Sequence, residues 1–297
     1  MNSKSPSRFP CPAVNWSLKT QTLSFENGPT IMGIVNATPD SFSDGGKFDS
    51  TEAAIDHAIQ LIEAGAGIVD IGGESTRPYS TPVGESEELD RVVPVVQGLV
   101  ERMKDGAVPA VPISIDTSKA AVAAAAIEAG AEIINDVTGL EGDPEMMQVA
   151  AASKVGVCAM HMQGTPQGMQ DNPVYENVVD DIYRYLADRQ QSLVDAGVAP
   201  SRICLDPGIG FGKTHQHNIT LLQNASRFFD LGCPILVGHS RKGFIGELLG
   251  DKEADRDSGT LAITLVLAQH GVHVIRVHEV KNTVAALKVM NGVMLPS

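Results

Sequence analysis

Short, continuously apolar segments alternate along the chain with longer stretches that are rich in Ala and Leu. The apolar segments are 30–35, 67–71, 111–115, 131–134, 155–160, 202–205, 233–237 and 271–277. Such unbroken apolar runs are typical of parallel strands that are buried on both faces. Each segment is therefore predicted to be a strand of a parallel sheet.

The longer stretches are predicted to be the helices that connect these strands. They span 51–64, 86–103, 119–129, 144–153, 177–196, 216–228, 256–269 and 280–291. Several stop at a glycine, as at Gly65, Gly130 and Gly197, and glycine commonly follows the last turn of a helix. Eight strand–helix units with no linker between them predict a single-domain α/β protein, a (β/α)8 TIM barrel, with a doubly wound open sheet as the alternative.

Residues 1–28 precede this pattern and are predicted to be an N-terminal extension to a barrel domain over 29–297. Segments 14–18 and 22–25 are expected to form a small hairpin under the barrel, and the residues before them to be disordered. The extension has no apolar run of the kind found in signal peptides. The longest apolar stretch of the chain, 261–268, is half of what a membrane span needs. We therefore expect a cytoplasmic protein with no membrane partner.

The net charge of the chain bears on which partners it can bind, and the spacing of its cysteines bears on whether they form disulfides or metal sites. The chain has 36 Asp and Glu against 22 Lys and Arg, which gives a net charge of −14. Because neutralising phosphates requires an excess of cations, no nucleic-acid partner is expected, although an anionic small substrate is compatible with a local cluster of Arg and Lys. Cys11, Cys158, Cys204 and Cys233 show no CxxC spacing. They are predicted to be free thiols, with a disulfide or metal role as the alternative.

Polar residues gather where the predicted strands end, which is where such barrels carry their chemistry. These residues include Asn36, Asp70, Glu74, Asp116, Asn135, Asp136, His161, Asp206, Ser240, Lys242, Arg276 and His278. A single one, such as Asp116, would be interpreted as the cap of the next helix. Polar groups at all eight strand ends are hard to attribute to capping, and they predict an active site.

Familiar phosphate and nucleophile motifs are incomplete in this chain. Segment 208–214 looks like a P-loop, but Pro207 stands where the first glycine is needed, and Lys213 interrupts a dinucleotide fingerprint. The nucleophile elbow suggested around Ser240 ends in Lys242 instead of glycine. His215 and His217 have no third ligand nearby and are predicted to be surface residues.

Taken together, the strand ends resemble the dihydropteroate synthase family, the folate-pathway enzymes that sulfonamides inhibit. The matching motifs are MGIVNATPDSFSDGG (32–46), GGESTRP (72–78), IDTS (115–118), IND (134–136), MHMQG (160–164), DPGIGFGK (206–213), SRK (240–242) and IRVH (275–278). The resemblance implies an eight-stranded αβ barrel. It also implies transfer of a dihydropterin-6-ylmethyl group from its diphosphate ester to the amine of 4-aminobenzoate, giving 7,8-dihydropteroate and diphosphate.

The resemblance further implies a role for each matching residue. Pterin-binding residues would be Asp116, Asn135, Asp206, Lys242 and Thr76, and diphosphate-binding residues Asn36, Ser240, Arg276 and His278. Asn36 would also be the protein ligand of Mg²⁺. Residues for 4-aminobenzoate would be Phe42, Thr76, Arg77, Pro78, Phe211 and Ser240, several of them on two loops, 38–47 and 72–82, that are interpreted as lids. The catalytic residues would be Asp116, Lys242 and Asp44. A homodimer is the implied assembly.

No protein nucleophile is evident or required if diphosphate leaves first and the pterin methylene becomes a delocalised cation. Asp116 would stabilise that cation electrostatically, and Asp44 would orient the amine. Three alternatives stay open at this point. They are a methyltetrahydrofolate methyltransferase on the same barrel, which would not need the diphosphate residues, a pterin-binding paralogue without catalysis, and an unrelated structural barrel.

Overall fold

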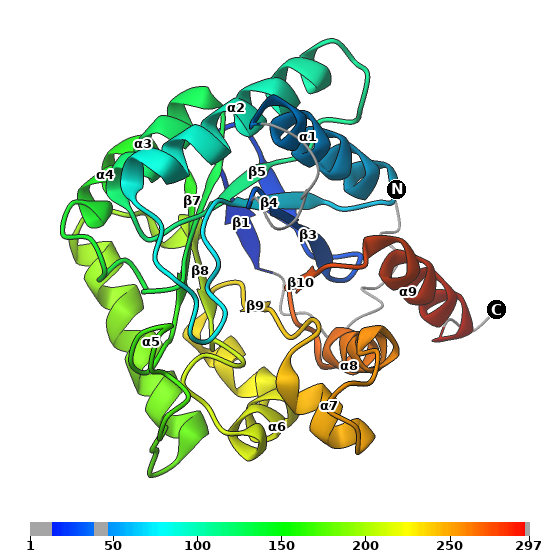
Figure 1. The fold of residues 1–297 in the computed structure, drawn as a ribbon. Coiled ribbons are helices and arrows are strands. Elements are labelled where there is room, and N and C mark those ends of the chain that lie inside the picture. Colours follow the sequence, from blue (N-terminus) through cyan, green and yellow to red (C-terminus); the bar gives the residue numbers. More distant parts are fainter. Residues whose placement is uncertain (1–13, 39–46, 295–297) are drawn as a thin grey trace, which may run out of the picture.

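The computed structural model describes residues 14–38 and 47–294, and its main feature is a sheet of eight parallel strands. The strands are β3 (Thr30–Asn36), β4 (Ile68–Gly72), β5 (Ile113–Asp116), β6 (Ile133–Asp136), β7 (Gly156–Met160), β8 (Ile203–Asp206), β9 (Leu236–Val237) and β10 (Val274–Val277). Their order in the sheet is β8-β7-β6-β5-β4-β3-β10-β9. A parallel bridge between Leu205 and Ile235 joins the two ends. The sheet therefore closes into the predicted barrel, and the open-sheet alternative is wrong (Figure 1).

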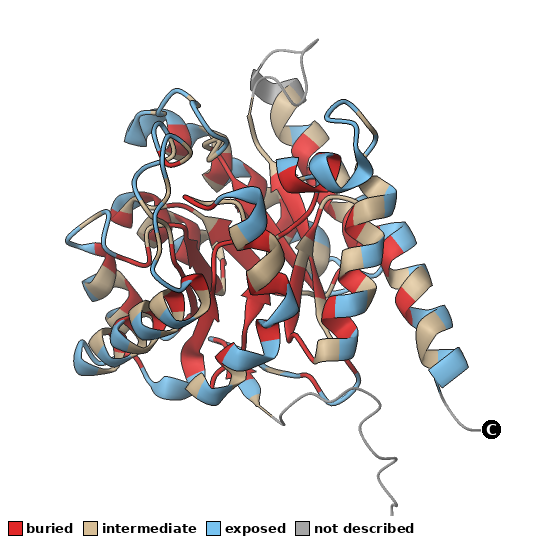
Figure 2. Cartoon of the chain, turned by 90° about the horizontal axis from the view of Figure 1, so that it is seen from below, coloured by how far each residue is buried: buried red, intermediate tan, exposed pale blue. Residues whose placement is uncertain are grey.

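Helices surround the barrel on its outer face (Figure 1). They are α1 (Lys47–Glu63), α2 (Glu85–Lys104), α3 (Ala120–Ala129), α4 (Met146–Ser153), α5 (Val178–Asp195), α6 (His215–Gln223), α7 (Gly243–Leu249), α8 (Asp257–His270) and α9 (Val280–Met294). Short 3₁₀ turns lie at η2 (Pro200–Arg202) and η3 (Ala225–Leu231). Buried residues line the strands and the inner sides of the helices, and exposed residues lie on the outer sides (Figure 2).

Two of the helix predictions need correction. The single helix expected over 216–228 is wrong, because α6 ends at Gln223 and the tighter turn η3 follows. The break lies at Asn224, whose N–H bonds to Thr220 O and Leu221 O. Helix α7 was not predicted at all. It is seven residues long and contains Gly243 and Gly246, so its sequence lacks the length and the propensity that reveal a helix.

The N-terminal hairpin closes the end of the barrel that lies opposite the strand ends. Strands β1 (Asn15–Ser17) and β2 (Thr22–Ser24) pair in antiparallel fashion, as predicted. Trp16 is fully buried, and its indole N–H donates to Arg202 O at 2.8 Å. Gly156 begins β7 next to this hairpin. A Cβ at this position would lie 2.5 Å from Leu18 Cδ2. The glycine thus allows the hairpin to pack tightly. Residues 1–13 lie outside the described part of the chain.

Two other expectations concern cysteines and membranes. Cys158, Cys204 and Cys233 are buried free thiols, as predicted, whereas Cys11 is not among the described residues. None of the described helices combines the length and the apolar character that a membrane crossing needs.

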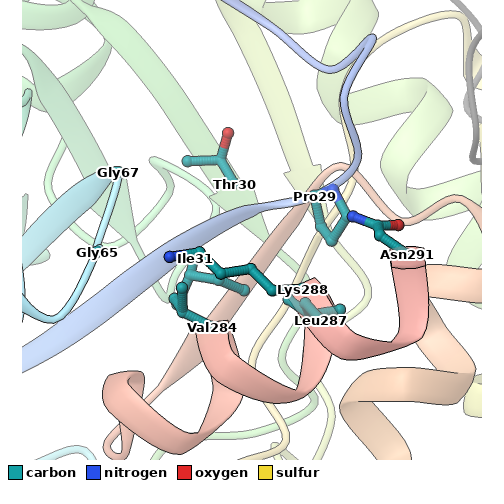
Figure 3. A pocket seen from close by; sticks show the side chains of 9 residues that line it. All are labelled: Pro29, Thr30, Ile31, Gly65, Gly67, Val284, Leu287, Lys288 and Asn291. Carbon is teal, nitrogen blue, oxygen red and sulfur yellow. The ribbon is translucent and has the colours of Figure 1, made fainter. Parts of the chain in front are cut away.

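A shallow cavity of about 280 Å³ opens between the start of β3 and α9. Val284, Leu287 and Lys288 of α9 face Pro29 and Ile31 across it (Figure 3). This cavity lies at the end of β3 opposite Asn36, so it does not belong to the face that carries the candidate chemistry.

Candidate active site

One guanidinium joins two carboxylates at the mouth of the barrel. Arg276 of β10 donates from Nε to Asp70 Oδ2 at 2.6 Å and from Nη2 to Asp116 Oδ2 at 2.7 Å. Asn135 Nδ2, at the end of β6, donates to the same Asp70 oxygen at 3.1 Å. Asp70 is fully buried. Residues from four strands therefore form one hydrogen-bonded network whose deepest member is Asp70.

Three of these four residues are predicted site residues, and the structure brings Asp116, Asn135 and Arg276 together. Asp70 has no predicted role. A signal was available, because Asp70 is the only charged residue in the otherwise apolar strand β4, and a buried charge requires partners.

Burial and charge pull in opposite directions within this network. Burial raises the pKa of Asp116 to about 7, although the nearby Arg276 guanidinium lowers it. Burial also disfavours the charge of Arg276, but Asp70 and Asp116 together raise its pKa above the ordinary value. Arg276 is therefore a permanent cation, and Asp116 is the carboxyl group whose ionisation responds to its surroundings.

A second carboxylate–cation group, Asp206 and Lys242, occupies the β8–β9 side of the mouth. Asp206 ends β8, is 5% exposed, and accepts the Gly208 N–H at 2.7 Å. Lys242 Nζ donates to Ile209 O and lies 4.4 Å from the centre of the Phe211 ring. Burial lowers the pKa of Lys242 to about 7 against the opposing effect of Asp206, and burial raises the pKa of Asp206. The structure thus groups three more predicted residues, Asp206, Lys242 and Phe211.

The glycine-rich segment 207–214 owes its sequence to packing against the end of β7. Gly208 and Gly212 have φ of 70° and 64°. A Cβ at Gly208 would lie 1.9 Å from His161 O, and one at Gly212 would lie 2.3 Å from Gln163 O. Side chains are therefore excluded at both positions by conformation and by space. The segment presents Phe211 to the site and does not form a phosphate loop.

Lys213 links segment 207–214 to His161 through buried contacts. It is 1% exposed, and its Nζ lies 2.9 Å from His161 Nδ1 and 2.8 Å from Phe211 O. Burial, together with the effect of Lys213, lowers the pKa of His161 to about 3, so the imidazole is neutral. Burial also lowers the pKa of Lys213 well below its usual value. Sequence analysis had noted His161 and Lys213 in motifs but had given neither a role in the site.

Ser240 and His278 form the part of the site that was predicted to bind diphosphate. The Ser240 Oγ accepts the His278 backbone N–H at 3.2 Å and lies 2.9 Å from His278 Nδ1. Burial lowers the pKa of His278 to about 3, and Arg276, Arg241 and Arg77 add to the effect. Asn36 ends β3 beside Gly72 of β4. His278 is therefore a neutral hydrogen-bonding group near several fixed cations.

The two predicted lids have different outcomes. Phe42 and Asp44 lie outside the described residues. In the second loop, Thr76 lines a cavity of about 520 Å³ with residues that follow β5, β6 and β7, among them Lys119, Thr138 and Met162. Arg77 and Pro78 are exposed. Within the described residues, no hydrogen bond or ion pair joins Thr76, Arg77 or Pro78 to Phe211 or Ser240.

His215 is an exposed residue as predicted, and His217 takes part in the capping box of α6.

Comparisons with known proteins agree on one family. A model of the pterin binding enzyme family matches residues 32–278. The dihydropteroate synthase of Escherichia coli (strain K12) is 45% identical over 266 residues, which cover 90% of this chain and 92% of that protein. A structure of Xanthomonas albilineans dihydropteroate synthase with 4-aminobenzoic acid matches with a TM-score of 0.87 and 42% identity, covering 96% of this chain and 100% of that one. A Yersinia pestis dihydropteroate synthase–sulfonamide drug complex matches with a TM-score of 0.86 and 43% identity, covering 94% and 99%.

Beside the network, Asp136 at the end of β6 is a buried carboxylate, and no cation is among its hydrogen-bond or ion-pair partners in the described part of the chain. Its Oδ1 accepts from Thr138 N and Thr138 Oγ1, both at 2.7 Å. Its Oδ2 is buried and has no hydrogen-bond partner among the described residues. Burial raises the pKa of Asp136 from 3.8 to about 6, although the Thr138 hydrogen bonds lower it.

We predict that the stability of the Asp136→Asn variant, relative to that of the unsubstituted chain, increases as pH rises. A raised carboxyl pKa contributes stability that is complete below pH 3.8 and is lost as pH rises through about 6. The unfolding free energy of Asp136→Asn, relative to the unsubstituted chain, should therefore increase by about 1.4 kcal/mol between about pH 5 and about pH 7.5. Equilibrium denaturation by urea at several pH values measures the difference. A difference that is independent of pH would contradict the assignment.

Proposed function

The chain belongs to the pterin binding enzymes, in the dihydropteroate synthase family, and from this membership we propose how its residues divide the reaction among them. The reaction transfers the 7,8-dihydropterin-6-ylmethyl group from its diphosphate ester to the amine of 4-aminobenzoate. The products are 7,8-dihydropteroate and diphosphate, so the chain is a transferase. The observation that carries the assignment of residues is the hydrogen-bonded network at the mouth of the barrel, in which Arg276 binds Asp116 and Asp70, and Asp70 binds Asn135.

Asp206 and Lys242 are proposed to recognise the pterin edge. The edge presents an amino group and a ring N–H beside a carbonyl, so a carboxylate can accept from the two donors while an ammonium donates to the carbonyl. Asp206 fits because it is buried and one oxygen already has the Gly208 N–H. Lys242 would exchange its bond to Ile209 O for the pterin. Asp116 and Asn135 would bind the remaining ring nitrogens, and Thr76 would contact the pterin from its loop.

The diphosphate is proposed to bind Arg276, Ser240, His278 and Asn36. A guanidinium has five N–H donors, and the hydrogen bonds to Asp70 and Asp116 account for one at Nε and one at Nη2. The remaining donors suffice for a bidentate contact with phosphate oxygens. Arg276 can therefore bind the leaving group without releasing the carboxylates that orient it.

We also propose Mg²⁺ as the cofactor, with Asn36 as its protein ligand. No group of three or more His, Cys, Asp or Glu side chains that could hold a metal exists among the described residues. This fits an ion that is held mostly by diphosphate oxygens, because Mg²⁺ commonly takes few protein ligands and shares substrate phosphates. When bound, the ion would neutralise charge on the departing diphosphate.

For 4-aminobenzoate, we propose a pocket between the barrel mouth and the loops. Phe211 and Ser240 would contribute from the barrel side, and Phe42, Thr76, Arg77 and Pro78 from the loops. Arg77 supplies a cation for the benzoate carboxylate. The related X. albilineans structure with 4-aminobenzoic acid supports a site for this compound.

In the proposed mechanism, the bond between the pterin methylene and the diphosphate oxygen breaks first, and both electrons leave with diphosphate. The methylene cation is delocalised into the pterin, and ionised Asp116 stabilises it. A unit charge about 4 Å away at an effective dielectric of about 20 contributes at most about 4 kcal/mol. The neutral arylamine then forms the C–N bond and loses a proton, so no strong base is required. Lys242 holds the pterin in place, and Asp44 would orient the amine.

We propose a homodimer on the evidence of apolar side chains on three consecutive helices. The exposed residues are Leu248 and Leu249 of α7, Val266 of α8, and Val289, Val293 and Met294 of α9. Contiguous exposed apolar surface of this kind marks sites of protein–protein contact.

Sedimentation equilibrium tests the proposed dimer. The expected mass is twice 31.3 kDa, and Val289→Asp combined with Val293→Asp should return it to 31.3 kDa. A single-chain mass for the unsubstituted protein would contradict the proposal.

Diphosphate release tests the activity directly. We expect release only when the purified chain receives dihydropterin-methyl diphosphate, Mg²⁺ and 4-aminobenzoate together, with dihydropteroate formed and a sulfonamide competing against 4-aminobenzoate. Omitting each component in turn is the control. Pterin binding without turnover would identify a non-catalytic paralogue, and release without Mg²⁺ would exclude the proposed cofactor.

Asp116→Asn tests the cation-stabilising role. The variant keeps an acceptor for Arg276 but loses the charge, so kcat should fall by about ten- to a thousandfold while affinity for the pterin diphosphate changes little. Steady-state kinetics and calorimetric titration measure the two quantities. Asp230→Asn, which removes a surface ion pair with Arg227, is the matched control. Equal losses in kcat and in affinity would contradict this role.

A further inference from the structure

Two side chains bridge the loop that carries Thr76, Arg77 and Pro78. Within the loop, Ser80 Oγ donates to Ser75 O at 2.5 Å, and Glu74 bridges the neck, where the two ends of the loop meet. Glu74 Oε1 accepts the Val83 N–H at 3.1 Å, so Glu74 joins the two ends of the segment 75–82. Glu74 Oε2 lies 2.5 Å from Lys119 Nζ. Arg91 Nη1, from α2, donates to Gly73 O at 2.7 Å immediately before the neck. The neck is therefore attached to the barrel at two points.

Lys119 is itself anchored from below. Its Nζ also contacts Glu88, a fully buried carboxylate of α2 whose second oxygen has no partner among the described residues. Burial disfavours the charge of Lys119, but Glu74 and Glu88 raise its pKa, so the ammonium stays charged. Lys119 follows Asp116 by three positions, at the start of α3. One ammonium thus connects the loop, α2 and the segment that leaves the pterin site.

The tip of the loop is held by weaker contacts. Tyr79 is 67% exposed and has φ of 63°. Its N–H donates to Pro166 O at 3.1 Å and its hydroxyl to Asp171 Oδ1 at 3.0 Å. Contacts in water contribute little to stability, whereas Lys119 and Glu74 are about one-fifth exposed and their charged hydrogen bond is stronger. We therefore expect the contacts of Glu74 at the neck to set the position of the loop.

We propose that Glu74 and Lys119 form a clasp that positions this loop for 4-aminobenzoate. This inference rests on the proposed function of the loop residues. Both are positioning residues, because they act through Thr76, Arg77 and Pro78 and touch no substrate themselves. The pterin side of the site depends on the clasp only through Thr76, since the other pterin residues, namely Asp206, Lys242 and those of the Asp70 network, are held by other contacts. The two substrates should therefore respond differently when the clasp is opened.

Glu74→Gln is the direct test. The glutamine keeps an oxygen for the Val83 N–H, loses the charge that holds Lys119, and leaves the Lys119–Glu88 pair intact. We expect the KM for 4-aminobenzoate to rise about five- to fiftyfold through misplacement of the loop. The dissociation constant of the pterin diphosphate, measured without 4-aminobenzoate, should stay within about twofold. Chymotrypsin should also cleave after Tyr79 faster than in the unsubstituted chain.

Three further variants separate positioning from folding. Lys119→Arg keeps a cation and should retain most of the affinity that the unsubstituted chain has for 4-aminobenzoate. Lys119→Met combined with Glu88→Gln removes the ammonium without leaving a buried charge alone, and should reproduce the effect of Glu74→Gln. Asp230→Asn removes a surface ion pair and should change neither KM nor cleavage.

Parallel changes in affinity for both substrates would overturn the proposal, as would an unchanged KM together with unchanged cleavage after Tyr79. Absence of dihydropteroate formation by the unsubstituted chain would instead overturn the proposed function. The cleavage rates would still show in that case whether the clasp holds the loop.

Discussion

The shared guanidinium of Arg276 is the interaction on which the rest of the site depends. Asp70 is fully buried and Asp116 nearly so, and leaving a buried carboxylate without its cation is strongly destabilising. Lys242 and Lys213 act similarly on Asp206: they lower its pKa, whereas burial raises it. Three carboxyl groups and three basic side chains therefore occupy the barrel mouth together, and burial shifts the pKa values of Asp116, Asp206, Lys213 and Lys242 toward their neutral forms. A substrate that enters meets closely spaced donors and acceptors.

The barrel makes this arrangement possible because it brings residues from distant parts of the chain to one rim. The side proposed for the pterin is held by buried contacts. Lys213 ties the β8–α6 segment to His161, and the glycines of that segment pack directly on the backbone after β7. The side proposed for 4-aminobenzoate is built from loops, whose attachment depends on a few side chains such as Glu74. The site thus combines a preformed half with a half whose geometry is set by tethers.

The sequence predicted the barrel because its strands are continuously apolar. It also indicated most of the residues that the structure brings together at the barrel mouth, because polar residues follow every strand. Other features depend on contacts that no local pattern contains. The link from Arg276 to Asp70 requires β3 to lie between β10 and β4, so Arg276 could be assigned to diphosphate but not to its carboxylate partners. The contact of Tyr79 with Asp171 joins loops 92 positions apart. Helix α7 was missed because seven residues with two glycines carry too little signal.

The same rim also contains groups that do not favour folding. Asp70 Oδ1, Asp136 Oδ2 and Glu88 Oε1 are buried without partners among the described residues, and each unsatisfied group costs about 1–3 kcal/mol. All three lie within or directly beneath the site, whereas the opposite end of the barrel is closed by an apolar cluster around Trp16 and Phe25. The carboxylates and this apolar cluster thus lie at opposite ends of the barrel. This separation allows the mouth to keep carboxylates poorly solvated, and a poorly solvated carboxylate is the one that interacts most strongly with a developing cation.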